Sequence, residues 1–193
     1  MKVNQKPGTL VYPLPAVLVS CGREETEYNI LTIAWVGTIC SNPPMCYISV
    51  RPERHSHGII SREKEYVINL TTKEMAFAVD WCGVTSGRDV RKFEEMNLTP
   101  VKSTVVAAPA IGEAPLSIEC RVVEVKSLGS HDMFISEVVN ILADDRFLSV
   151  GVRNPNTKSF DLEAAGLLAY VQEKYYELGN FVGKFGWSVK TKK

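Results

Sequence analysis

The fold of this chain is decided by two apolar runs, Leu31-Thr-Ile-Ala-Trp-Val-Gly-Thr-Ile-Cys40 and Met45-Cys-Tyr-Ile-Ser-Val-Arg51, and by the turn Ser41-Asn-Pro-Pro44 between them. Both runs are typical of strands, so the stretch predicts a β-hairpin. Because side chains alternate across a strand, one face of the first run is expected to be small and partly polar. That face holds Thr32, Ala34, Val36, Thr38 and Cys40, whereas Leu31, Ile33, Trp35 and Ile39 on the other side are bulky and suit a core.

The segment after this hairpin is basic. Arg51 is followed by Arg54-His-Ser-His-Gly58, and Ser56 is predicted to cap a short helix that continues through Arg62. A phosphate needs cations and hydroxyl or amide donors, and the free N–H groups at a helix N-terminus favour anions. We therefore predict that Arg51, Arg54, Ser56 and His57 bind the phosphate of a flat, partly polar ligand on the small strand face.

The composition is that of an ordinary globular protein, with 45% hydrophobic and 23% charged residues in a chain of 193. The 22 basic and 22 acidic residues cancel, so no net charge draws the chain to nucleic acid or to an anionic membrane. No apolar run approaches transmembrane length and the first residues lack the apolar region of a signal peptide, which predicts a cytoplasmic protein. The length predicts a single domain over residues 1–193.

The cysteines and histidines predict neither disulfides nor a metal site. The five cysteines are Cys21, Cys40, Cys46, Cys82 and Cys120. They form no C-x-x-C pair, and their odd number favours free thiols. His55 and His57 are two residues apart, but no further ligand of the zinc kind lies near them in the sequence.

The rest of the chain predicts mainly strands. Strands are expected at Glu65–Thr71, Leu116–Val125 and Asp132–Leu142, and helices at Lys73–Trp81, from Ser86 onward, and at Leu162–Leu178 before Gly179. Gly151–Phe160 is predicted to be a loop. Many short strands without a βαβ rhythm predict an antiparallel barrel, mainly β with minor α, that carries short helical inserts and a C-terminal helix.

A series of motifs resembles the flavin reductase-like family of FMN-binding split barrels, and within it the flavoredoxin-type branch. In order, the motifs are Asn29-x-x-Thr32-x-Ala34-Trp35-Val36-Gly37, Pro43-Pro44, Ser49-Val-Arg51, Ser56-His57, Val67-Ile-Asn69-Leu70, Cys82-Gly83, Ser86-Gly-Arg-Asp-Val-x-Lys92-Phe93, Gly129-Ser-His131-Asp132 and Tyr175-Tyr176-x-Leu178-Gly179. They extend over nearly the whole chain. The resemblance implies a Greek-key split β-barrel, a homodimer, and FMN bound without a covalent link near the subunit interface.

The resemblance also implies the residues around FMN besides the phosphate cluster. Hydrogen bonds to the ribityl chain and the ring edge are expected from Thr32, Thr38, Ser41, Ser49 and Asn69, and room for the ring is expected beside Ala34, Gly37 and Cys40. The other expected members of the site are Trp35, Val36, Val50, Leu70, Ser86, Lys92, Phe93 and Tyr175. His131 is expected near the open face of the ring, where it would orient a nicotinamide or relay a proton.

The implied function is an FMN-dependent oxidoreductase that takes electrons from NADH or NADPH and passes them to free flavin, a metal complex or a redox protein. Two alternatives remain open. One is an FMN electron carrier of the flavoredoxin kind without a nicotinamide site, and the other is a flavin-binding or storage protein without turnover. A hydrolase built on Ser130, His131 and Asp132 is disfavoured, because adjacent strand residues point to opposite faces.

Overall fold

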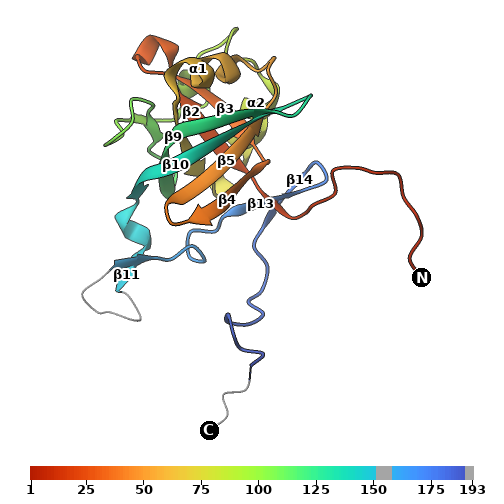
Figure 1. Ribbon diagram of the computed structural model, residues 1–193. Coiled ribbons are helices and arrows are strands. Elements are labelled where there is room, and N and C mark those ends of the chain that lie inside the picture. Colours follow the sequence, from red (N-terminus) through yellow and green to blue (C-terminus); the bar gives the residue numbers. More distant parts are fainter. Residues whose placement is uncertain (151–157, 190–193) are drawn as a thin grey trace.

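The computed structural model describes residues 1–150 and 158–189, in which strand residues clearly outnumber helical ones (Figure 1). In chain order the elements are β1 (Leu14–Pro15), β2 (Val17–Cys21), η1 (Glu25–Glu27), β3 (Asn29–Ile33), β4 (Val36–Ser41), β5 (Pro44–Val50), α1 (His55–Glu63), β6 (Glu65–Leu70), η2 (Lys73–Met75), α2 (Ala76–Val84), α3 (Lys92–Glu95), β7 (Pro100–Val101), β8 (Ala110–Ile111), β9 (Leu116–Ser127), β10 (Asp132–Ala143), η3 (Asp145–Phe147), β11 (Leu148–Val150), β12 (Lys158–Phe160), β13 (Leu168–Val171) and β14 (Lys174–Glu177). The predicted class, mainly β with minor α, is confirmed. None of the helices in the described ranges has the length and apolar character needed to cross a bilayer.

One antiparallel sheet of seven strands forms the body, in the order β3-β2-β6-β9-β10-β5-β4. Its two edge strands, β3 and β4, follow each other in the chain with only Ala34 and Trp35 between them. The sheet must therefore curl until its edges approach each other, which gives a barrel split along the β3–β4 seam (Figure 1). The strands predicted at Leu116–Val125 and Asp132–Leu142 are confirmed as the long pair β9 and β10.

Strand β2 is buried on both faces, and this joins the barrel to its helical cover. Val17 and Val19 belong to the apolar core inside the barrel, whereas Leu18 between them belongs to a second core on the outer face. Helix α2 supplies Val79 and Cys82 to that second core. Because both sides of β2 exclude water, burial of apolar area holds α2 firmly against the barrel wall.

The predicted strand over Leu31–Cys40 is in fact two strands. β3 ends at Ile33 and β4 begins at Val36, where the chain passes from one edge of the sheet to the other. The amide of Ser49 donates a 2.9 Å hydrogen bond to the carbonyl of Trp35 within this passage. The alternation of a continuous strand therefore fails beyond Ile33, and Ile39, expected in the core, is 45% exposed.

The predicted C-terminal helix at Leu162–Leu178 is wrong. β13 and β14 pair there as an antiparallel hairpin, and β13 also pairs with β1. Tyrosine and valine favour strands, and β1 offers β13 a second pairing partner, so tertiary pairing overrides the helical spacing. Of the predicted loop over Gly151–Phe160, residues 151–157 lie outside the described ranges and Lys158–Phe160 forms β12.

The remaining helices differ from the prediction mainly at their starts. Helix α1 begins at His55 with Arg54 in the N-cap position, so Ser56 is not the cap. The Ser56 hydroxyl instead accepts a 2.7 Å hydrogen bond from the side-chain amide of Asn29. The helix predicted at Lys73–Trp81 is present as η2 and α2, and the one predicted from Ser86 is the short α3.

Candidate functional site

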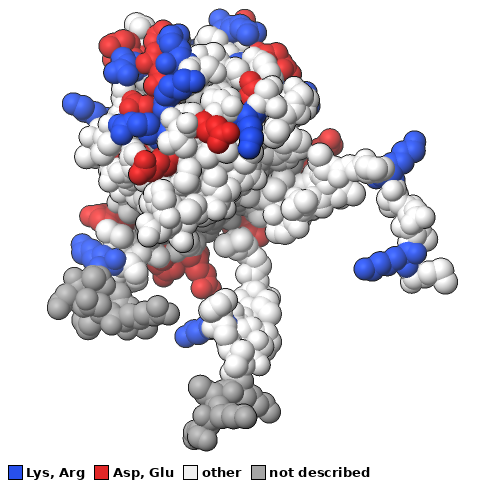
Figure 2. All heavy atoms as spheres, viewed as in Figure 1, with Lys and Arg blue, Asp and Glu red and all other residues white. Residues whose placement is uncertain are grey.

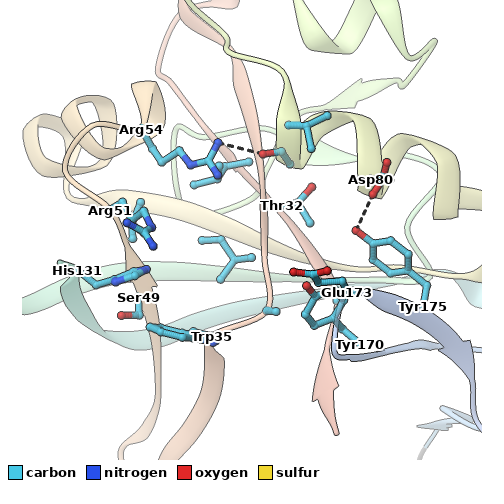
Figure 3. A pocket seen from close by; sticks show the side chains of 17 residues that line it. Thr32, Trp35, Ser49, Arg51, Arg54, Asp80, His131, Tyr170, Glu173 and Tyr175 are labelled. Atoms are coloured by element: carbon cyan, nitrogen blue, oxygen red, sulfur yellow. Dashed lines mark hydrogen bonds between the residues drawn. The ribbon is translucent and has the colours of Figure 1, made fainter. Parts of the chain in front are cut away.

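A pocket of about 480 Å³ opens at the seam of the barrel (Figure 3). Its walls come from the β3–β4 junction, the end of β5, the start of β10, helix α2 and the β13–β14 hairpin. Several residues predicted from the sequence line it together: Thr32, Ala34, Trp35, Ser49, Val50, Arg51, Arg54, His131 and Tyr175. Strand pairing brings these distant stretches together, because β10 lies beside β5 and its Asp132 and Met133 stand opposite Val50 and Ser49.

The pocket also contains residues that the sequence did not indicate: Ala16, Leu31, Ile33, Asp80, Gly83, Val84, Tyr170 and Glu173. Leu31 and Ile33 were expected only in the core. Tyr170 and Glu173 were missed because their segment was predicted as a helix. The two-residue turn of this hairpin, Gln172-Glu173, has none of the Asn or Gly residues that usually mark such a turn.

His131 stands against the indole of Trp35 at one side of the pocket. The ring centroids are 4.5 Å apart and the rings are tilted by 35°. Nδ1 of His131 lies 2.9 Å from the hydroxyl of Ser130. Burial, and after it the positive charge of Arg51, lowers the pKa of His131 below its ordinary value. The imidazole is therefore neutral near pH 7, with Nε2 available for one further hydrogen bond.

The other side of the pocket carries phenols and carboxylates. The Tyr175 hydroxyl donates a 3.2 Å hydrogen bond to Oδ1 of Asp80 on α2. Burial, together with the charge of Asp80, raises the pKa of Tyr175 to about 12, so the phenol keeps its proton. Glu173 lies beside Tyr170 at the tip of the hairpin (Figure 3). The pocket is thus basic where β5 meets α1 and acidic where α2 meets the hairpin.

A second pocket, also about 480 Å³, adjoins the first and shares Leu31, Arg51 and Arg54 with it. To the two arginines it adds the polar residues Asn29, Glu53, His55, Ser56, Thr85, Ser86, Arg88 and Lys92. Arg54 is held in place by a 2.9 Å hydrogen bond from Nη1 to the carbonyl of Gly83. Arg51 lies 3.6 Å from the carboxylate of Glu53. The predicted site residues Ser56, Ser86 and Lys92 therefore meet in a mainly basic hollow next to the first pocket.

Lys92 is the most telling residue of this second pocket, because it is a cation in the interior. It is only 2% exposed, and its ammonium donates a 2.7 Å hydrogen bond to the carbonyl of Cys82. Within the described part of the chain, no carboxylate forms an ion pair with it. Burial is the main cause that lowers the pKa of Lys92. A buried cation without a counter-charge is costly, so this pocket suits an anion.

The predicted site residues on β4 lie outside both pockets. They are Val36, Gly37, Thr38, Cys40 and Ser41. Tyr47 covers Gly37 so closely that a Cβ there would meet its ring at 3.0 Å. Cys40 donates a weak 3.5 Å hydrogen bond to the carbonyl of Asn42. Val36, Thr38 and Cys40 were predicted to share one strand face with Thr32, and the break between β3 and β4 separates them from it.

Four further predicted residues serve the interior. Asn69 is fully buried, and its side chain donates to the carbonyl of Leu18 at 3.0 Å and accepts from the hydroxyl of Ser117 at 2.7 Å. Nε2 of His57 lies 2.8 Å from the carboxylate of Asp132. The other two, Leu70 and Phe93, pack against the apolar cores. None of the four lines either pocket.

Within residues 1–150 and 158–189, no three His, Cys, Asp or Glu side chains form a group that could hold a metal ion. All five cysteines are free, as predicted. The linings of the two pockets could hold an organic ligand with a flat ring at one end and a phosphate at the other. The first pocket offers an indole, an imidazole and small side chains, and the second offers cations and hydroxyls.

Comparison with known proteins gives matches over much of the chain. A family model described as "Flavin reductase like domain" matches residues 9–179. A protein of Archaeoglobus fulgidus is 31% identical over 137 residues, which are 71% of this chain and 76% of the relative. The reductase component of the 4-nitrophenol 4-monooxygenase/4-nitrocatechol 2-monooxygenase of Rhodococcus opacus is 28% identical over 126 residues, which are 65% of this chain and 64% of that protein. Among solved structures, flavoredoxin of Desulfovibrio vulgaris (Miyazaki F) superposes with a TM-score of 0.88 at 28% identity, covering 98% of this chain and 100% of that one.

Proposed function

The chain belongs to the flavin reductase-like domain family, and on that premise we propose that it is an FMN-dependent oxidoreductase driven by NADH or NADPH. One observation carries the proposal: a pocket that holds Trp35 and His131 adjoins a basic pocket around the buried Lys92. The ring of FMN would occupy the first pocket and its phosphate the second. The acceptor would be free flavin, a metal complex or a redox protein, and the printed name of the Rhodococcus relative as a reductase component supports a reductase role.

The redox chemistry would be that of FMN, which accepts a hydride from a reduced nicotinamide and passes electrons to the acceptor. The protein would bind and orient the reactants. Arg51, Arg54, Ser86 and Lys92 would hold the phosphate through charge-assisted hydrogen bonds. Ser49 and Thr32 would bond the polar edge of the ring, and Thr32 can accept there because its hydroxyl already donates to the carbonyl of Val79. His131 would orient the nicotinamide through Nε2 or pass a proton at that atom.

We also propose that the protein is a homodimer. The projecting C-terminal segment exposes large apolar side chains, namely Leu178, Phe181, Val182, Phe185, Trp187 and Val189. The described parts of both chain ends extend away from the barrel and carry few charges, whereas charges of both signs mix over the body (Figures 1 and 2). Such side chains normally lie against another surface. Light scattering after size exclusion should give twice the mass of one 21.4 kDa chain, and the mass of a single chain would contradict the proposal.

The function is tested by anaerobic mixing of FMN-loaded protein with NADH and, separately, with NADPH. The reductase predicts rapid loss of the visible flavin absorbance with at least one nucleotide, faster than for free FMN without protein. Loss only after addition of an electron-transfer protein would favour the alternative, an electron carrier, to which the likeness to flavoredoxin points. Failure to take up FMN at micromolar concentration would refute both. His131→Ala should slow the reduction and leave FMN affinity nearly unchanged.

A further inference from the structure

Helix α2 (Ala76–Val84) is apolar on every side, although its outer side is exposed. Asp80 is its one charged residue. The inner side packs into the second core, whereas Phe77 and Val84 on the outer side are 75% and 76% exposed. Trp81, half-buried, lies between them at helical spacing. A helix that is hydrophobic all round is normally buried, so this outer side is expected to lie against another surface.

The segment that follows β14 has a similar composition. Residues 178–189 contain one charge, that of Lys184, among mostly apolar side chains and glycines. Phe181 and Phe185 are exposed, and the segment extends away from the barrel (Figure 1). The amide of Trp187 donates a 3.0 Å hydrogen bond to the carbonyl of Lys184, so the segment forms a turn of its own. Its apolar side chains also need a surface to pack on.

The helix and the segment are complementary in charge. On the helix, Asp80 lies between Phe77 and Val84 in the chain, and its carboxylate is exposed. Among the described residues, neither Asp80 nor Lys184 takes part in an ion pair. An apolar surface with one anion and an apolar segment with one cation would bury both apolar areas on contact and give each charge a counter-charge.

The direction of the segment favours a second copy of the chain as its partner. The hairpin lies on α2 through the 3.2 Å hydrogen bond from Tyr175 to Asp80, but the chain beyond it leaves the body (Figure 1). Twelve extended residues can span about 40 Å, which is enough to reach a neighbouring copy. In a dimer with two-fold symmetry, each copy would give one segment and receive one, so both exposed surfaces of both copies would be covered.

We propose that residues 178–189 dock on the outer side of α2 of a second copy, with the partner's Lys184 beside Asp80. This inference rests on the homodimer proposed above and names the surface that receives the segment. Because Asp80 and Val84 also line the first pocket, the docked segment would lie beside the mouth of that pocket and form part of its surroundings.

The first test measures the dissociation constant of the dimer by sedimentation equilibrium of the full-length protein. Phe77→Ser should raise this constant by at least about a hundredfold, because the apolar contact is lost twice in a symmetric dimer. Thermal denaturation should confirm that this exposed substitution leaves the fold intact. Val123→Ser is the matched control, because it removes an exposed apolar side chain from β9, and it should change the constant by less than about threefold.

The second test concerns the charge pair. Asp80→Asn keeps an oxygen that can accept from Tyr175 and removes the charge, and Lys184→Met removes the cation. Each substitution should raise the dissociation constant by roughly fivefold or more. The double variant should bind no more weakly than either single variant, because both remove the same interaction. Fully additive effects would overturn the pairing of Asp80 with Lys184.

The third test identifies the segment on the helix. The photoreactive residue p-benzoylphenylalanine is incorporated at position 77, and dimers are formed from a mixture of ¹⁴N and ¹⁵N chains. We expect cross-links that join a light chain to a heavy chain within residues 178–189. Cross-links confined to one chain would mean that the segment folds back on its own helix, and cross-links to residues 1–13 would mean that the other chain end covers α2. Either result would overturn the inference.

The outcomes also separate this inference from the proposals that precede it. A dimer that is unaffected by Phe77→Ser would overturn the docking on α2 and leave the homodimer intact. A native protein that sediments as a single chain would overturn both, whereas the reduction of FMN by NADH or NADPH would still be tested separately.

Discussion

Nε2 of His57 and Oδ2 of Asp132 lie 2.8 Å apart, and this contact ties the first turn of α1 to the start of β10. The two elements carry opposite parts of the site. Arg54 is the N-cap residue of α1, and His131 directly precedes Asp132 in the chain. The ring of His57 also packs edge-on against Phe134 at 5.2 Å between centroids, so the contact is continuous with the core. The pair therefore fixes the distance between the basic end of the site and the imidazole expected at the ring.

This pair predicts a measurable coupling. In a double-mutant cycle of His57→Ala and Asp132→Asn, the interaction should contribute about 1 kcal/mol to the free energy of unfolding, because the pair is mostly but not fully buried. The neighbouring polar groups of Ser127 and His57 lower the pKa of Asp132. The stabilisation should therefore be complete above the ordinary pKa of the carboxyl and disappear as the pH falls through its lower folded value. Urea titrations across this pH range measure the coupling energy and its pH dependence. Additive effects of the two substitutions on the unfolding free energy would contradict the coupling.

The stability of the protein should also depend on the titration of His131, because here the fold disfavours the charged form of the side chain, whereas it favours the charged form of Asp132. Its folded pKa lies below the ordinary value of 6.5 because burial and Arg51 disfavour the imidazolium. Between the two values the unfolded chain binds more protons, so stability should rise with pH there and become constant above 6.5. Burial lowers the pKa of His55 as well, so NMR titration of each imidazole is the appropriate measurement. A resonance of His131 that titrates above the ordinary value would contradict the prediction.

The sequence predicted the basic half of the site better than the acidic half, for a physical reason. Arg51 and Arg54 lie three residues apart, so their clustering is visible in the chain itself and survives in the structure. Asp80 and Glu173 line the same pocket only because a hairpin far along the chain lies beside α2, and no short-range sequence pattern predicts that arrangement. The same limitation explains why the site residues predicted on β4 lie outside both pockets. Strand alternation correctly predicts neighbours within one strand, but the chain changes sheet edges at Ala34, and alternation cannot report such a change.

Glu119 predicts a large effect away from the pockets. It is fully buried, and its carboxylate accepts hydrogen bonds from the amides of Thr104, Val105 and Val106 and from the side chain of Asn140, at distances of 2.9, 2.6, 3.0 and 2.8 Å. Burial tends to raise the pKa of Glu119, but these four donors outweigh it and lower the pKa. Glu119→Gln places an NH₂ group among donors and should lower the unfolding free energy by about 3 kcal/mol. In the native protein, the stability that this carboxylate contributes should be lost as the pH falls through its lowered pKa.

The control for Glu119 is Glu124→Gln on the same strand, where the carboxylate is exposed. That change should alter the unfolding free energy by less than about 0.5 kcal/mol. Equal effects of the two substitutions in urea titrations would show that the hydrogen-bond cluster around Glu119 does not stabilise the fold.

Replacing Lys92 should affect the binding of FMN much more than the stability of the apo-protein. In Lys92→Met the buried charge disappears together with the hydrogen bond to the Cys82 carbonyl. These two changes offset each other, so the unfolding free energy of the apo-protein should change by less than about 1 kcal/mol. If the second pocket holds the phosphate of FMN, the dissociation constant of FMN should rise by roughly tenfold or more, because a charge-assisted bond is lost. Riboflavin, which has no phosphate, should bind almost as before.

Fluorescence titrations with both flavins and thermal denaturation of the apo-protein make the comparison. Lys126→Met is the matched control, because it removes the same charge from an exposed position on β9. It should leave both affinities unchanged, which excludes a general effect of net charge. Equal losses for FMN and riboflavin in Lys92→Met would mean that Lys92 supports the shape of the ring pocket and that the phosphate binds elsewhere. An FMN affinity that stays at the native value would contradict the placement of the phosphate in the second pocket, because an anion bound there should interact with this buried cation.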